Sequence, residues 1–424
     1  MTEPYVRLWR DYLTQARWFQ GKGLPIGEIA WRVLPWHTRA GDVWVRSELP
    51  EIVIGEVRET YHLLAGYLPA GTAEPDALVG QTELAGRGLV DVVDAPRSTR
   101  AMAALLEALA QPDSPGMTWF DAAPDPHSPT AVFTGEQSNT TVQVGEDLQF
   151  KVFRKIAIGQ NLEATMLAAL RRSGITPRLV GTLTTAGGDI NLGVFIQRIR
   201  DARDGWDYCV QACQAERPIM DEMTRLGATL RSLHADLAQA FGSSTVDGGT
   251  LGRQMLARLK TACAQTPELA DKCPSLRAVF DLHDMSVPIQ RVHGDFHLGQ
   301  ALISPDGWTI IDFEGEPLKT PEERAAPDSP WRDVAGLLRS LDYARHYHPE
   351  PDSPSAMDWY DDARRALLDG YRGGQPVPAT LLRAYEIDKA VYELVYETRN
   401  RPTWAPIPRH AIDEAIAGLP TVTE

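Results

Sequence analysis

Cysteine is scarce in this chain, with four among 424 residues. Cys209 and Cys213 are separated by three residues on a predicted helix, and Cys263 and Cys273 have no histidine at ligand spacing. A zinc site needs closely spaced cysteine and histidine pairs, so these residues do not indicate one. We expect all four to be ordinary buried or partly exposed thiols in a reducing compartment.

Long apolar runs and excess positive charge are also missing. No stretch is long enough to cross a bilayer, and the start, MTEPYVRLWRDYL, lacks the regions of a signal peptide. We therefore expect a cytoplasmic protein with no membrane partner. The 42 Lys and Arg face 57 Asp and Glu, which gives a formal net charge of −15. Nucleic acid is not an expected partner, because binding its backbone needs a clustered positive surface.

Internal repeats and the Walker A motif are absent too, which argues against a solenoid and against a P-loop fold. What remains is an ordinary globular composition, 43% hydrophobic and 23% charged. The length is too great for one core and predicts two or three domains.

The first part of the chain reads as a small α+β region. Alternating stretches predict strands over 43–49, 51–57 and 59–68, and AMAALLEALA predicts a helix over 101–110. Proline, aspartate and serine then mark a boundary over 121–130.

The next part, 131–200, predicts two strands around a polar turn, a helix over 161–174 and a closing strand over 192–200. Almost everything after residue 210 has helical periodicity. The predicted helices lie at 219–241, 251–265, 331–347, 357–374 and 381–399. The fold class is therefore α+β, with a small sheet domain before a large helical one.

The stretch RVHGDFHLGQ, with the following IIDFEGEP, carries the clearest chemistry. Asp295 precedes Gln300 by the spacing with which kinase catalytic loops place a base and a metal ligand. Asp312 ends an apolar run seventeen residues after Asp295, where a second metal-binding carboxylate would lie. His293 and His297 are four apart, but nearby glycines break a regular helix and disfavour a zinc site.

Residues upstream of this stretch also fit the requirements of phosphoryl transfer. Lys151 lies in a short strand, and Glu163 in the following helix is its candidate ion-pair partner in a kinase-like arrangement. Without the downstream acids, Lys151 would read as a solvated strand lysine. EQSNTT, 136–141, is a candidate phosphate-covering turn, although it lacks the glycines of a Gly-rich loop.

HGDFHLGQ and IIDFEGEP resemble the aminoglycoside-phosphotransferase-like kinases, which share the eukaryotic protein kinase fold. Together with KVFRK, QARWFQGKG and the tail AYEIDKAVYELVYETRNRPTWAPIP, they are similar to the maltokinases among them. The resemblance implies ATP- and Mg²⁺-dependent phosphorylation of maltose on its anomeric hydroxyl. The product would be maltose 1-phosphate, which feeds glycogen-type α-glucan synthesis, and a trehalose synthase is a possible partner that supplies maltose.

The resemblance also implies a bilobal fold with an N-terminal α+β cap subdomain over 1–90 and an intermediate subdomain over 91–130. A sheet-containing kinase N-lobe would then occupy 131–200, and a helical C-lobe with the catalytic loop and sugar site would occupy 201–424.

Carried over by residue, Asp295 would be the catalytic base, and Gln300 and Asp312 the magnesium ligands. The expected nucleotide contacts are Lys151, Glu163, Ser138, Asn139, Thr140, Gln197 and Ile199, the last two on the strand 195–199 that would meet adenine. The expected sugar contacts are His297, Glu314, Arg332, Tyr392, Glu397, Asn400 and Trp404. Core packing is the alternative for Tyr392.

Other functions remain open from the sequence. A kinase of another sugar or amino sugar, such as a glucosamine kinase, would keep the catalytic motif, although Glu314 and Glu316 favour maltokinase. An antibiotic phosphotransferase is a more distant alternative. A pseudokinase scaffold is disfavoured, because Asp295, Gln300 and Asp312 are all present.

Overall fold

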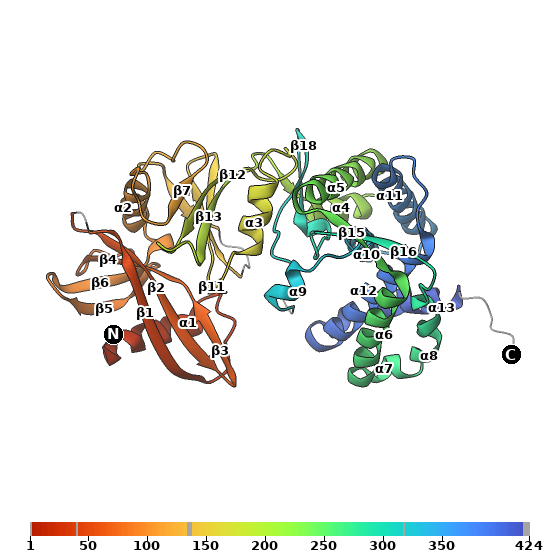
Figure 1. Cartoon of the computed structure of the whole chain (residues 1–424), viewed down its shortest axis with the longest axis horizontal. Helices are drawn as coiled ribbons and strands as arrows, with labels where there is room; N and C mark the ends of the chain where they lie inside the picture. Colours follow the sequence, from red (N-terminus) through yellow and green to blue (C-terminus); the bar gives the residue numbers. More distant parts are fainter. Residues whose placement is uncertain (1, 40, 134–137, 317–318, 419–424) are drawn as a thin grey trace. The chain divides into compact units, whose positions relative to one another are not determined.

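The computed structural model describes residues 2–39, 41–133, 138–316 and 319–418. The chain divides into an N-terminal unit, Met1–Arg171 with Pro177–Arg200, and a C-terminal unit, Arg172–Thr176 with Asp201–Glu424. Figure 1 shows the first unit, red to yellow, built mainly from strands and the second, green to blue, mainly from helices. This confirms the predicted order of a sheet-rich part followed by a helical part. The finer division into cap and intermediate subdomains stays a prediction.

A seven-stranded antiparallel sheet opens the N-terminal unit, in the order β11-β3-β2-β4-β6-β5 with β1 paired to β2. Its strands are β1 (Ile26–Thr38), β2 (Trp44–Ile54), β3 (Val57–Tyr61), β4 (Leu63–Pro69), β5 (Leu78–Leu84), β6 (Gly88–Asp94) and β11 (Lys155–Ile156). The amphipathic helix α1 (Glu3–Gln15) buries Trp9 and Leu13 in the same core as Tyr61 and Tyr67 of the sheet.

Two strands predicted separately, 43–49 and 51–57, are largely one strand, β2, which runs through Pro50. β2 pairs with β4 over Trp44–Glu48 and with β3 over Glu51–Ile54. Pro50 lies where β2 changes partner, so its missing N–H removes no bond on that side. The prediction of a break there was wrong because the sequence does not show the change of partner.

The second sheet of the unit has the order β7-β12-β13-β10-β9-β8. Its strands are β7 (Met117–Trp119), β8 (Thr130–Val132), β9 (Thr140–Val144), β10 (Leu148–Val152), β12 (Leu179–Thr184) and β13 (Asn191–Gln197). Phe150 on β10 stacks on Phe195 on β13, with ring centroids 4.2 Å apart, inside the sheet's buried face. The helices of this region are η1 (Ala95–Arg97), α2 (Thr99–Leu109) and α3 (Leu162–Ala169).

Helix α3 is shorter than predicted, since the sequence indicated a helix to residue 174 and the structure ends it at Ala169. Residues Arg172–Thr176 instead belong to the C-terminal unit, where the carbonyl of Ile175 accepts a 2.8 Å hydrogen bond from the N–H of Ile310. This tertiary pairing overrides the helical pattern. The strand β12, which follows, was not predicted.

The C-terminal unit confirms the five helices predicted after residue 210. Its helices are α4 (Gly205–Gln214), α5 (Met220–Phe241), α6 (Gly248–Gln265), α7 (Pro267–Ala270), α8 (Cys273–Leu276), η2 (Arg277–Phe280), η3 (Leu298–Gln300), α9 (Pro321–Ala325), α10 (Trp331–Arg345), α11 (Pro354–Arg372), α12 (Ala379–Asn400), η4 (Pro402–Trp404) and α13 (Pro406–Ala417). Its short strands are β14 (Arg203–Asp204), β15 (Ser243–Asp247), β16 (Ser286–Gln290), β17 (Ala301–Ser304) and β18 (Gly307–Ile310).

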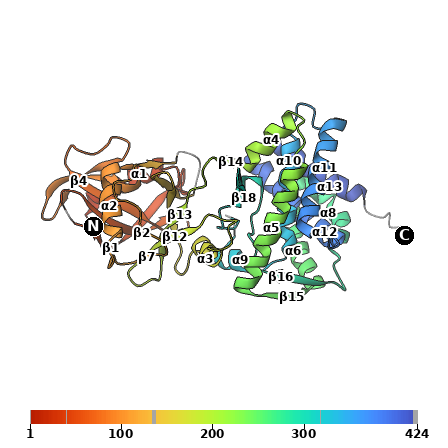
Figure 2. The same cartoon turned by 90° about the horizontal axis from the view of Figure 1, so that it is seen from above.

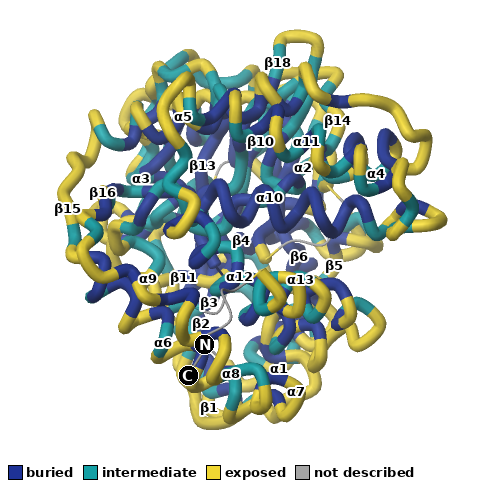
Figure 3. Tube along the Cα trace, turned by 90° about the vertical axis from the view of Figure 1, so that its right-hand side faces the viewer, coloured by how far each residue is buried: buried dark blue, intermediate teal, exposed yellow. Residues whose placement is uncertain are grey.

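Helix α10 forms the centre of this unit and is buried continuously from Asp333 to Arg345, as its dark blue trace in Figure 3 shows. It packs against α11 and α12, and α11 packs against α5 (Figure 2). A Cβ at Gly227 on α5 would lie 2.2 Å from the carbonyl oxygen of Leu367 on α11. Only glycine allows α5 and α11 to approach this closely.

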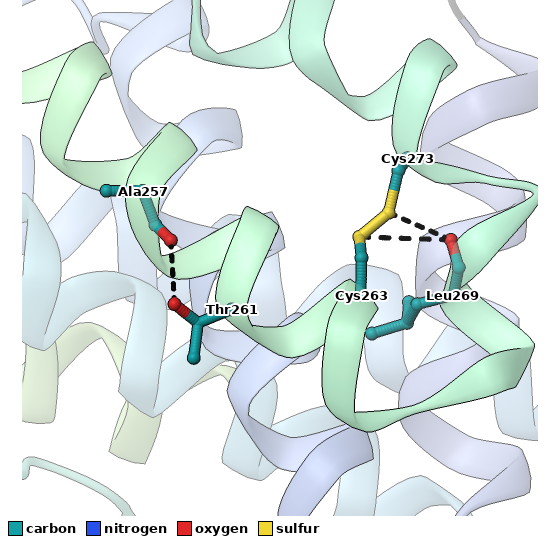
Figure 4. The surroundings of a disulfide bond; sticks show 5 residues. All are labelled: Ala257, Thr261, Cys263, Leu269 and Cys273. Carbon is teal, nitrogen blue, oxygen red and sulfur yellow. Dashed lines mark hydrogen bonds between the residues drawn. A yellow bond between two sulfur atoms is a disulfide. The ribbon is translucent and has the colours of Figure 1, made fainter.

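The cysteines depart in part from the expectation of four thiols. Cys209 and Cys213 are buried free thiols, as expected. Cys263 on α6 and Cys273 on α8 instead form a disulfide, which Figure 4 shows. The chain reverses through α7 and leaves their Cα atoms 6.6 Å apart, within the range of a disulfide. Spacing along the sequence does not reveal this proximity. Every helix in the described ranges is too short or too polar to serve as a membrane span.

Candidate active site

Asp295 lies in the loop after β16, and neighbouring residues set the backbone of that loop. Gly294 has a φ of +86°, a left-handed conformation that glycine adopts without a steric penalty. His297 caps η3, because its Nδ1 accepts a 3.1 Å hydrogen bond from the N–H of Gly299. The side chain of Asp295 is 21% exposed, so its carboxylate is accessible to a ligand.

Asp333, near the start of α10, accepts hydrogen bonds from the backbone of the same loop. Its Oδ2 accepts hydrogen bonds from the N–H of His293 at 2.7 Å and from Nε2 of His234 at 2.9 Å. Its Oδ1 accepts from the N–H of Gly294 at 2.8 Å. Burial alone would raise the pKa of Asp333, but these donors hold it below its usual value. The sequence reasoning missed this residue, whose only sequence signal is an acidic side chain in the first turn of a predicted helix.

The two predicted magnesium ligands lie side by side. Nε2 of Gln300 donates a 3.0 Å hydrogen bond to Oδ2 of Asp312. Asp312 has a φ of +64°, a left-handed conformation that non-glycine residues adopt rarely and that is found at functional sites. An amide oxygen and a carboxylate are the hard oxygen donors that Mg²⁺ prefers, so this pair fits the ion.

In the N-terminal unit, Lys151 and Glu163 form the predicted ion pair. Nζ of Lys151 on β10 lies 2.7 Å from Oε2 of Glu163 on α3, and the two side chains are only 12% and 3% exposed. Asn161 begins α3 by accepting a hydrogen bond from the N–H of Ala164, which fixes where Glu163 enters the helix. This is the pairing that kinases use to hold a phosphate-binding lysine.

The polar turn before β9 is described only from Ser138 onward, and Glu136 and Gln137 lie outside the described residues. Ser138 is exposed. Oδ1 of Asn139 accepts a 2.9 Å hydrogen bond from the N–H of Arg154, and Oγ1 of Thr140 accepts one of 2.8 Å from its Nε. Both side chains therefore support a buried arginine, and a role in nucleotide binding stays a prediction.

The strand predicted to meet adenine is β13, which ends at Gln197. Gln197 is exposed, and its backbone N–H donates to the carbonyl of Arg178. Ile199 follows the strand and is partly buried. Contacts of Gln197 and Ile199 with adenine stay a prediction.

A cavity of about 480 Å³ opens beside Asp295 within the C-terminal unit. It lies among the catalytic loop, α6, α10 and α12. Among the residues that line it are Arg258, Gln265, Gly294, Asp295, Glu316, Lys319, Asp328, Arg332, Tyr385, Asp388, Lys389, Tyr392 and Arg399. Its size falls within the range of about 300–1,000 Å³ typical of small-molecule sites.

Glu316 is the centre of the charge network in this cavity. It forms ion pairs with Arg332 at 2.8 Å, Lys319 at 2.9 Å and Lys389 at 3.0 Å. Burial alone would raise the pKa of Glu316, but the three cations hold it well below its usual value. Arg332 also pairs with Asp328 at 3.0 Å, so the arginine predicted to bind sugar is fixed between two carboxylates.

The predicted sugar contacts are not all in one place. Arg332 and Tyr392 line the cavity, whereas the other five, all described residues, are not among its lining. Glu397 is buried and accepts hydrogen bonds from Arg401, while Trp404 packs on Tyr343. Asn400 donates to the carbonyl of Tyr396 on its own helix. His297 caps η3, and Glu314 lies between Asp312 and Glu316 in the chain; sugar contacts by these five residues stay predictions.

Several lining residues were missed by the sequence reasoning. The missed residues Tyr385, Asp388 and Lys389 recur with the predicted Tyr392 at three- and four-residue spacing on α12, so they lie on one face of the helix. That spacing was visible in the sequence, but it is equally typical of a helix packed into a core.

Comparison with known proteins shows the family to which this chain belongs. Residues 130–379 match the phosphotransferase enzyme family, APH, which covers more than half of the chain. The chain therefore belongs to the phosphotransferase enzyme family, and the candidate site residues Asp295, Gln300 and Asp312 lie inside the matched region.

Named relatives are glucosamine kinases. The chain is 30% identical over 310 residues to a glucosamine kinase of Streptacidiphilus jiangxiensis, covering 64% of this chain and 70% of the relative. It is 26% identical over 394 residues to one of Mycolicibacterium smegmatis, covering 80% and 93%. A solved glucosamine kinase in complex with glucosamine, ADP and inorganic phosphate shares the fold, with a TM-score of 0.69 at 22% identity over 96% of this chain and 98% of that one.

Proposed function

We propose that this protein transfers the γ-phosphoryl group of ATP to a hydroxyl of an amino sugar, with glucosamine as the acceptor. The observation that carries the proposal is the cavity beside Asp295, which presents carboxylates to a small ligand. The named relatives support the amino-sugar acceptor that the sequence left as an alternative, in preference to maltose.

In the proposed reaction, Asp295 accepts the proton of the attacking sugar hydroxyl. The oxygen then forms a bond to the γ-phosphorus as the bond to ADP breaks. Lys151, held by Glu163, contacts the nucleotide phosphates. Gln300 and Asp312 hold Mg²⁺, which when bound neutralises phosphate charge.

The amino group of the acceptor is an ammonium ion near neutral pH, and a carboxylate is its natural partner. Asp328 and Asp388 line the cavity and are 23% and 18% exposed, so each retains access to the cavity beside its arginine partner. Tyr392 also lines the cavity, where its ring would pack on the apolar side of a pyranose. Arg332 then donates to sugar hydroxyls.

Maltose is the second candidate, because the maltokinase-like tail supplies seven residues of the cavity lining, Tyr385, Asp388, Lys389, Val391, Tyr392, Val395 and Arg399. The cavity volume does not separate a monosaccharide from a disaccharide. Phosphorylation of maltose would connect the protein to α-glucan synthesis and to a trehalose synthase.

The test is a panel of glucosamine, maltose, glucose and kanamycin with ATP and Mg²⁺, in which product NMR identifies the phosphorylated position. A phosphorylated glucosamine, formed with the highest kcat/KM of the panel, supports the proposal. Maltose 1-phosphate as the preferred product would replace the acceptor and keep the phosphotransferase. ADP formation that no acceptor stimulates would overturn both.

A further inference from the structure

Lys389, on α12, joins the predicted catalytic carboxylate to the acidic segment after β18. Its Nζ lies 3.3 Å from Oδ1 of Asp295 and 3.0 Å from Oε1 of Glu316. The same ammonium lies 5.1 Å from the centre of the Tyr392 ring, within cation–π distance. Three segments far apart in the sequence therefore meet at one cation.

Glu316 is placed to hold Lys389 and is poorly placed to bind sugar. Its side chain is only 10% exposed, and its carboxylate is already shared by Lys319, Arg332 and Lys389. A buried carboxylate of this kind needs its cations, because an unpaired buried charge costs several kcal/mol. Glu316 thus acts as the anchor that fixes the Lys389 ammonium next to Asp295.

The ammonium of Lys389 stays charged near neutral pH. Burial alone would lower the pKa of Lys389, but the carboxylates of Glu316 and Asp295 raise it above its usual value. A fixed positive charge in hydrogen-bonding contact with one oxygen of Asp295 leaves the second oxygen to meet a ligand.

We propose that Lys389 is the positioning residue of the catalytic base, which it holds in one orientation. This inference rests on the proposed phosphoryl transfer. When the sugar O–H bond breaks, the proton passes to Asp295, the oxygen bonds to phosphorus, and ADP leaves. Lys389 itself gains and loses no proton in this step and acts only through Asp295.

A positioning role predicts an effect on turnover rather than on binding. Replacing Lys389 by methionine keeps the length of the side chain and removes its charge. We expect kcat of K389M to fall about 100-fold, the loss that a misplaced reacting group produces, while the KM values for ATP and acceptor change less than about threefold. K389R should recover part of kcat.

Chemical rescue separates this role from a structural one. In K389A, ethylammonium supplied in solution should restore part of kcat, whereas an equal concentration of sodium ion should not. K260M, at an exposed lysine on α6, is the matched control and should retain wild-type kinetics. Melting temperatures of all variants show that they are folded.

Three outcomes would overturn the inference: an unchanged kcat in K389M, a loss confined to KM, or a kcat loss that neither arginine nor ethylammonium relieves. Each of these leaves the proposed function intact, provided that the wild-type protein phosphorylates an acceptor. Failure of the wild-type protein on the whole acceptor panel would instead remove the proposed function.

Discussion

Oδ1 of Asp333 accepts a 2.8 Å hydrogen bond from the backbone N–H of Gly294, the residue before Asp295. In the wild-type protein, the two carboxylate oxygens of Asp333 accept hydrogen bonds from three donors. The side-chain amide of D333N has only one oxygen that can accept. We expect the free energy of unfolding to fall by about 1.5–3 kcal/mol, the range for hydrogen bonds to a charged group, and kcat to fall with it as Asp295 loses its support. Urea denaturation and steady-state kinetics measure the two effects.

The control for D333N is D361N, at an exposed aspartate on α11. It should leave both unfolding and turnover near wild type. If D333N were as stable and as active as D361N, Asp333 would not position the loop.

Removing the charge of Glu163 should weaken nucleotide binding. Lys151 loses the carboxylate 2.7 Å away, so its ammonium is no longer fixed for the phosphates. We expect E163Q to raise the KM for ATP about tenfold, equivalent to about 1.4 kcal/mol, with the acceptor KM unchanged. E107Q, at an exposed glutamate on α2, is the control. An E163Q protein with wild-type ATP kinetics would argue against a nucleotide role for the pair.

The metal-ligand assignment predicts a specific change in magnesium dependence. D312N removes a charged oxygen ligand next to Gln300. The Mg²⁺ concentration that gives half-maximal rate should therefore rise about tenfold or more, which corresponds to a loss of at least about 1.4 kcal/mol in the free energy of Mg²⁺ binding. Titration of MgCl₂ at fixed ATP measures this shift. Removal of divalent ions with EDTA should abolish turnover of the wild-type protein, and added Mg²⁺ should restore it. Turnover that persists in EDTA would contradict the assignment.

His62 predicts a pH dependence of stability in the N-terminal unit. It is fully buried against Ser47 and the carbonyl of Phe153, and burial followed by the charge of Arg154 lowers its pKa from 6.5 to about 3. The unfolded chain therefore binds a proton between these values that the folded chain does not. The contribution of neutral His62 to the free energy of unfolding is therefore fully present above pH 6.5. This contribution declines as the pH falls toward 3 and is smaller by about 2 kcal/mol at pH 5.

The measurement is urea denaturation at pH 7 and pH 5 for the wild-type protein and for H62N. H62N loses this titration, so its stability should change less between the two pH values even if its absolute stability is lower. H127N, at an exposed histidine, should keep the wild-type difference. Equal pH dependence in H62N and wild type would show that His62 is not held neutral.

Local patterns predicted the parts of this protein that depend on neighbours in the sequence. Gln300 and Asp312 lie together because they flank the hairpin formed by β17 and β18, whereas their metal-binding role and the role of Asp295 stay predictions. The ion pair of Lys151 and Glu163 was predicted correctly, because β10, which carries Lys151, and α3, which carries Glu163, are close together in the sequence.

Features that depend on distant segments were not predictable in this way. Lys389 reaches Asp295 from a helix that begins 84 residues later in the chain, at Ala379, and nothing near either residue indicates the contact. The Cys263–Cys273 disulfide needs the reversal at α7, and β2 continues through Pro50 only because its partner strand changes there. Each was decided by tertiary packing, which overrides local propensity.

The most direct test of the account compares the wild-type protein with D295N in glucosamine-dependent ADP formation, with ATP and Mg²⁺ saturating. The account predicts that kcat falls about 100- to 10,000-fold, the contribution of a positioned general base. The melting temperature should change little, since Asp295 is partly exposed in the cavity. A folded D295N protein that phosphorylates glucosamine at the wild-type rate would contradict the assignment of Asp295 as the catalytic base.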